Sequence, residues 1–151
     1  MKLAEALLLR SDQQKMLDSM KQRINANVLV QEGDSPSENP LDLIQQAFNL
    51  NKKLQSLILK INQTNAQAIL DDGRTMLSVL QQREMLIEQH RILMGAITSA
   101  QKETDRYSVR EIKWQKVVSV SELQKQADDV SLKIRTINIL IQENNWKLEL
   151  I

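Results

Sequence analysis

The chain has 151 residues, and its 42% hydrophobic and 26% charged content is typical of a globular domain rather than a disordered chain. Twenty basic and nineteen acidic residues leave a net charge of +1, which excludes a strong overall field attracting nucleic acid or anionic membranes. Cysteine is absent, which excludes disulfides, thiolate metal sites and a cysteine nucleophile and fits a reducing cytoplasm, the expected location.

The low content of chain-breaking residues favours long helices. Only three glycines and two prolines occur, and no segment approaches the ~18 consecutive apolar residues of a membrane span. The first helix is expected from about residue 2 to residue 25, because Leu3, Leu7, Leu17 and Ile24 recur at helical spacing. We therefore expect a mainly α protein, a single domain over residues 1–151 with four long helices packed as in a bundle.

Two further helices follow an exposed loop at residues 31–39. Asn39 can cap the second helix and Pro40 suits its first position, and the apolar stripe then continues to about residue 65. The sequence Asp71-Asp72-Gly73 is a turn signal. After Thr75, a plausible cap, the third helix is expected to extend to about residue 103.

One segment has the alternating pattern of a strand. Ile112, Trp114 and Val118 alternate with polar neighbours, so residues 109–118 could pair with residues 28–30 as a small β-ribbon. No internal repeat is apparent. Ser119 and Glu122 then have the spacing of a capping box, which predicts a fourth helix from there to the end of the chain.

The fourth helix has more apolar surface than one core requires. Beside its main stripe, Leu132, Ile139 and Trp146 follow at seven-residue intervals and form a second ridge, to which Leu150 adds. Either this ridge is an internal face of a monomer, or another subunit covers it. We expect the second arrangement, a homo-oligomer with a structural or adaptor role, because tryptophan is enriched where protein interfaces are strongest.

Polar side chains interrupt the apolar stripes of two helices. Arg10 lies on the stripe of the first helix, and Arg83 and His90 lie on the stripe of the third. Such residues commonly form a satisfied polar layer that fixes helix register. The alternative is a small-ligand binder or enzyme in which Arg10, Arg83 and His90, with Asp105 and Arg106, bind a carboxylate or phosphate.

No cofactor, metal site or reaction can be named from the sequence. Glycines occur only at positions 33, 73 and 95, so no phosphate-binding loop can be written, and the single histidine rules out paired Glu-x-x-His motifs. Basic and aromatic residues mix over residues 106–116, as in proteins that bind single-stranded nucleic acid. Three acidic residues at positions 103, 105 and 111 dilute that charge, so this is the weaker alternative.

Short segments spread over nearly the whole chain form a recognisable series. They are MKLAEAL (1–7) with Arg10, VQEGD (30–34), INQTN (61–65), DGRT (72–75), DRYS (105–108) with EIK (111–113), and IQ (141–142) with NW (145–146). In order and spacing they resemble a small bacterial family that carries the name septicolysin.

The resemblance implies a compact helical protein without an established activity. The name alone would imply a pore-forming toxin, whereas the chain has no segment of membrane length. Polar residues of these segments are expected either in a shared site or in caps and turns. They are Asn62, Asn65, Arg74, Asp105, Arg106, Tyr107 and Asn145.

Overall fold

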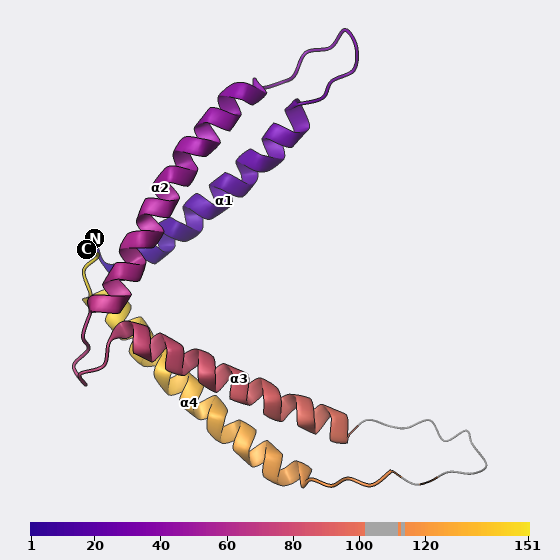
Figure 1. The fold of residues 1–151 in the computed structure, drawn as a ribbon, viewed down its shortest axis with the longest axis vertical. Coiled ribbons are helices and arrows are strands. Elements are labelled where there is room, and N and C mark those ends of the chain that lie inside the picture. The colour runs from indigo at the N-terminus through magenta and orange to yellow at the C-terminus, as the bar shows by residue number, and fades with distance from the viewer. Residues whose placement is uncertain (102–111, 113) are drawn as a thin grey trace. The chain divides into compact units, whose positions relative to one another are not determined.

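Four long helices make up most of the protein. The computed structural model describes residues 1–101, 112 and 114–151. Its helices are α1 (Leu3–Asn27), α2 (Pro40–Gln67), α3 (Met76–Ala100) and α4 (Val120–Lys147), shown in Figure 1. The predicted mainly α class with four helices is confirmed.

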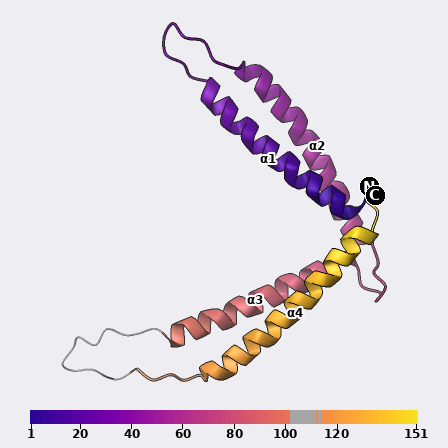
Figure 2. The ribbon, with the colours of Figure 1, turned by 180° about the vertical axis from the view of Figure 1, so that it is seen from behind.

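The helices pair as two hairpins. α1 lies beside α2 and α3 beside α4 in both views (Figures 1 and 2). The chain divides into two compact units, one formed by residues 1–76 and 142–151 and the other by residues 77–141. The expectation of a single domain over residues 1–151 stays a prediction, which an unfolding experiment tests below.

The first hairpin has an apolar seam between α1 and α2. Leu17 from α1 packs with Ala47 and Leu54 from α2, and partly buried residues surround this cluster. Asn39 caps α2 through its Oδ1, which accepts a hydrogen bond of 3.0 Å from Leu41 N, and Pro40 occupies the first turn. The predicted start of this helix is therefore confirmed.

Polar contacts close the loop between α1 and α2. Asn27 donates from Nδ2 to Arg23 O at 2.8 Å and accepts at Oδ1 from Glu38 N at 3.0 Å. Arg23 Nε also donates to Glu38 Oε2 at 2.9 Å, and this contact lowers the pKa of the Glu38 carboxyl. Side chains thus satisfy backbone groups that the end of α1 leaves open.

The second hairpin has its own buried residues. Val79, Leu86 and Ile97 of α3 are buried, as are Ala127 and Ile137 of α4. Ser119 Oγ accepts a hydrogen bond of 3.3 Å from Glu122 N at the start of α4, as the sequence predicted.

The expected β-ribbon is not present among the residues that the structure describes. Residues 28–30 have no strand partner within the described part of the chain: Val28 ends α1 in a helical conformation and an exposed loop follows directly. Part of the other expected strand, residues 109–111 and 113, lies outside the described residues. Extended pairing occurs instead in two isolated bridges, Lys2 with Glu149 and Ile69 with Thr75.

The two hairpins are repeats of one unit. α1 and α3 each have 25 residues, and α2 and α4 each have 28. Adding 73 to a residue number converts α1 into α3 at both ends, and adding 80 converts α2 into α4. Identical residues at equivalent positions include Leu7 and Leu80, Arg10 and Arg83, Leu43 and Leu123, Ala47 and Ala127, Ile61 and Ile141, and Asn65 and Asn145.

The backbone confirms this equivalence where the helices end. Each bridge follows the 28-residue helix of one repeat and precedes the 25-residue helix of the other, and each has the same two hydrogen bonds. The equivalent pairs are Leu3 N to Leu148 O and Met76 N to Ala68 O, then Leu150 N to Met1 O and Leu70 N to Arg74 O, at 2.8 to 3.0 Å. The expectation of a chain without an internal repeat is therefore wrong.

Candidate functional site

The outer ridge of α4, defined as Leu132, Ile139 and Trp146, is exposed. The three residues are 52%, 55% and 57% exposed. At 3.6 residues per turn, positions seven apart lie on one side of a helix, whereas Ile141 points about 180° away from Leu132. Ile141 is buried, so the ridge lies on the side of α4 opposite its core stripe.

Leu150, the fourth residue expected in the interface, lies beyond the end of α4. It is half-buried, and its backbone N–H donates to Met1 O at 2.9 Å. Its equivalent in the first repeat, Leu70, is buried. The expected place of Leu150 in the interface stays a prediction.

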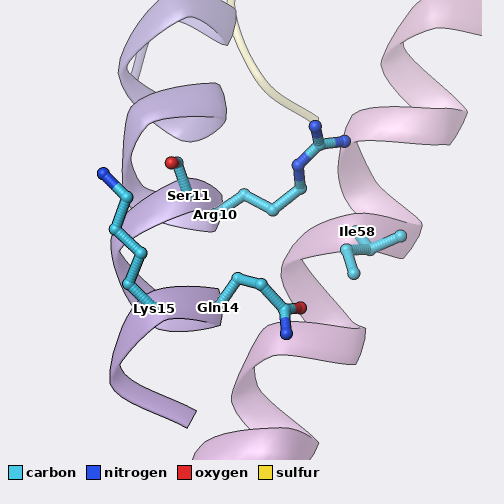
Figure 3. A pocket seen from close by; sticks show the side chains of 5 residues that line it. All are labelled: Arg10, Ser11, Gln14, Lys15 and Ile58. Carbon is cyan, nitrogen blue, oxygen red and sulfur yellow. The ribbon is translucent and has the colours of Figure 1, made fainter. Parts of the chain in front are cut away.

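A basic hollow lies on the first hairpin. It measures about 400 Å³ and is lined by Arg10, Ser11, Gln14 and Lys15 of α1 and by Ile58 of α2. Arg10 and Gln14 point toward α2, whereas Lys15 points away from it (Figure 3). Within the described chain, neither Arg10 nor Lys15 makes a hydrogen bond or ion pair.

The equivalent surface of the second hairpin has no excess of positive charge. Ser11 and Lys15 are replaced there by Glu84 and Glu88. Arg83, the equivalent of Arg10, pairs with Glu84 at 2.9 Å. The same place in the repeat is therefore an open basic surface in one hairpin and a self-neutralised one in the other.

The residues predicted for an anion site lie on different elements. Arg10 is exposed on α1, in the first unit, while Arg83 and His90 are half-buried on α3, in the second. Seven residues separate Arg83 from His90, which is about 10 Å along a helix. Asp105 and Arg106 lie outside the described residues, so the proposed convergence of these five groups stays a prediction.

Most of the segment considered for nucleic-acid binding, residues 106–116, also lies outside the described residues. Of its described part, Trp114 is 83% exposed and Ile112 is exposed.

The described residues form neither a metal cluster nor a membrane-spanning helix. Residues 1–101, 112 and 114–151 contain no group of three histidine, aspartate or glutamate side chains arranged to hold a metal ion. No helix in this part of the chain is long and apolar enough to cross a membrane.

Several recurring polar residues belong to turns and helix ends. Asp72 accepts at Oδ1 from Arg74 N at 3.0 Å, and Arg74 Nε donates to Asp72 Oδ2 at 2.9 Å. This pairing lowers the pKa of the Asp72 carboxyl. Asn145 is buried and Asn65 is half-buried, at equivalent places in the repeat.

The contact between the two ends of the chain was not predicted. Lys2 Nζ lies 2.6 Å from Glu149 Oε1, and the Met1 amine lies 3.2 Å from Oε2. These cations hold the pKa of the Glu149 carboxyl below its usual value. Thr64 Oγ1 also accepts from Ile151 N at 3.2 Å. The sequence contains no signal for this contact, because the burial of Thr64 is seen only in the structure and its hydroxyl also donates to a local acceptor, Lys60 O, at 2.9 Å.

Comparison with known proteins places the chain in a family. None of the curated proteins matches it. A crystal structure of a functionally unknown conserved protein from Corynebacterium diphtheriae is 31% identical, with a TM-score of 0.91 over 100% of this chain and 99% of that chain. A family model described as "Family of unknown function (DUF6847)" matches residues 10–150. The resemblance to a small family without an established activity is thereby confirmed, although neither description contains the name septicolysin: the chain belongs to the DUF6847 family.

Proposed function

We propose that this protein is a non-catalytic homo-oligomer with a structural or adaptor role, held together through the outer ridge of α4. The observation that carries the proposal is the exposure of Leu132, Ile139 and Trp146 on the side of the helix that faces away from its core. Burying an apolar side chain of this size contributes about 1.5 to 3 kcal/mol relative to leaving it exposed. A second copy would cover all three at once.

The composition of the ridge supports a protein partner. Tryptophan contributes a large apolar area and is enriched at the centres of interfaces. Cytoplasm is the proposed location, because a chain without cysteine is unaffected by reducing conditions. Separating cell fractions and probing each for the protein checks that location.

A substitution on the ridge tests the proposed assembly. Ile139→Glu should convert the oligomer into a monomer in sedimentation velocity experiments at micromolar concentration, because a carboxylate would have to be buried at the contact. Leu59→Glu is the matched control, because Leu59 is the equivalent exposed residue of α2. An Ile139→Glu variant that assembles as the unmodified chain does would eliminate this ridge as the interface.

A second candidate function is the binding of a small anion on the first hairpin. The observation that favours it is the hollow into which Arg10 points from α1 without a partner within the described chain. The Arg10 guanidinium, which points toward α2, suits a phosphate or carboxylate. Titration with inorganic phosphate should then show saturable binding that Arg10→Gln weakens at least about tenfold, a loss typical of charge-assisted bonds. Equal binding by both proteins would refute it.

A further inference from the structure

The outer ridge of α4 has complementary charges at mirror positions about its centre. Arg135 lies four residues before Ile139 and Glu143 lies four residues after it, while Leu132 and Trp146 lie seven residues before and after. Arg135 and Glu143 are exposed, and within the described residues neither makes a hydrogen bond or an ion pair. The surface is therefore complementary to a second copy of itself that runs in the antiparallel direction.

We propose that α4 packs antiparallel against α4 of a second copy, with a twofold axis at Ile139. This arrangement rests on the proposed homo-oligomer and specifies its contact. In this register Leu132 faces the partner's Trp146, Arg135 faces the partner's Glu143, and Ile139 faces its own copy. A twofold contact uses the same patch on both subunits, so every pairing occurs twice, and twofold dimers are the commonest protein oligomers.

The spacing of packed helices allows these contacts. Arg135 and Glu143 flank the ridge by about 40° on opposite sides, at 100° per residue. Helices pack with their axes about 8 to 10 Å apart, a separation that arginine and glutamate side chains can bridge. The two ion pairs would lie between the central Ile139 contact and the outer Leu132 and Trp146 contacts, where the apolar side chains partly exclude water.

The repeat shows that these features are particular to α4. On α2, the positions equivalent to Arg135, Glu143 and Trp146 are occupied by Gln55, Gln63 and Ala66. The same face of the same scaffold thus lacks both charges and the aromatic anchor. Helix formation and core packing alone do not require them, because α2 forms the same 28-residue helix without them.

The outer face of α2 is the competing surface. It exposes Leu41, Phe48 and Leu59, but its charge is one-sided: Lys52 lies on this face, and Asp42, in the first turn, is the only acidic residue of α2. Two such faces would bring lysines together without a carboxylate between them, a repulsive arrangement. Charge complementarity therefore favours pairing through α4.

Exchanging the two charges tests the register. Arg135→Glu alone or Glu143→Arg alone places like charges opposite each other twice per dimer, which should raise the dimer dissociation constant at least about tenfold. A mixture of these two variants should form a heterodimer, because both contacts between them are then oppositely charged. Lys133→Glu is the matched control, an identical charge change on an exposed position away from the ridge, and should leave the dimer unchanged.

Native mass spectrometry of the single variants, their mixture and the unmodified chain separates the outcomes. A monomeric unmodified chain overturns the proposed oligomer itself. An oligomer that both single variants leave intact, or variants that weaken assembly without forming the heterodimer when mixed, overturns the antiparallel register alone.

A cross-link supplies an independent measurement. The natural chain has no cysteine, so Ile139→Cys introduces a single thiol, which a short thiol-specific reagent should join to its copy at the twofold axis. Phe48→Cys should remain uncross-linked. Cross-linking at position 48 and not at 139 would instead identify the outer face of α2 as the contact and overturn the proposal.

Discussion

Leu54 is the residue whose truncation should destabilise the first hairpin most clearly. It is 1% exposed and packs with Leu17 and Ala47 at the seam between α1 and α2. Leu54→Ala removes three carbon atoms, a transfer loss of about 2.4 kcal/mol at about 0.8 kcal/mol each. The remaining cavity adds to this loss, because packed helices relax only partly, and leucine-to-alanine changes in cores cost about 3 to 5 kcal/mol in total.

Urea denaturation followed by circular dichroism measures the effect. With a slope of about 2 kcal/mol per molar urea, a loss of 3 kcal/mol lowers the midpoint by about 1.5 M. Leu59→Ala is the control on the same helix, where the side chain is 58% exposed and the expected change is within about 0.5 kcal/mol. Both variants are compared at one protein concentration, because self-association adds to stability. Equal midpoints for the two variants would refute the seam as the core of this hairpin.

Three further predictions follow from the ends, turns and units of the chain. Glu149→Gln should lower the free energy of unfolding at neutral pH. Because the pKa of Glu149 is lowered in the folded protein, the stabilisation by this carboxylate is full above the ordinary value of 4.5 and is lost as the pH falls through the folded-state value. Urea unfolding measured over a range of pH checks this, and a difference between the two proteins that persists unchanged at the most acidic pH would contradict it. Gly73→Ala should destabilise by about 1 kcal/mol because Gly73 has φ +84°, whereas Gly95→Ala, in α3 with open space around it, should stabilise by a similar amount; thermal melts showing the same sign for both would contradict it. If residues 1–151 form a single domain, calorimetry should give one two-state transition, and two separate transitions would show that the hairpins unfold independently.

Helical periodicity predicted the helices well and their ends less well. The first three helices were expected at about residues 2–25, 40–65 and 75–103, close to the observed bounds. The fourth helix was expected to reach the end of the chain, but α4 ends at Lys147. It ends there because the backbone of Leu148 and Leu150 forms hydrogen bonds with the backbone of Leu3 and Met1. That contact joins the two ends of the chain, and local sequence patterns contain no information about such distant partners.

The repeat was missed because the two halves match in residue class more than in identity. Leu54 and Leu57 correspond to Ile134 and Ile137, and Thr64 corresponds to Asn144. The offset also changes from 73 to 80 within the repeat, because residues 28–39 form one connection and residues 101–119 the other. A search at a single fixed period therefore finds little.

The candidate site was predicted in part. Seven-residue spacing identified the ridge on α4, and its three residues are exposed. Exposure itself could not be predicted, because periodicity reports which residues share a side of a helix but not which neighbour covers that side. Helical spacing predicts Arg10 on the seam, whereas it lies at the edge of the hollow, where a long side chain reaches water.

The mass of the untagged, unmodified chain in solution tests the central claim most directly. Native mass spectrometry at micromolar concentration should show a discrete multimer of the 17.4 kDa chain, with the dimer as the smallest assembled species. A monomer alone, unchanged as the concentration is raised, would contradict the claim that the outer ridge of α4 binds a second copy.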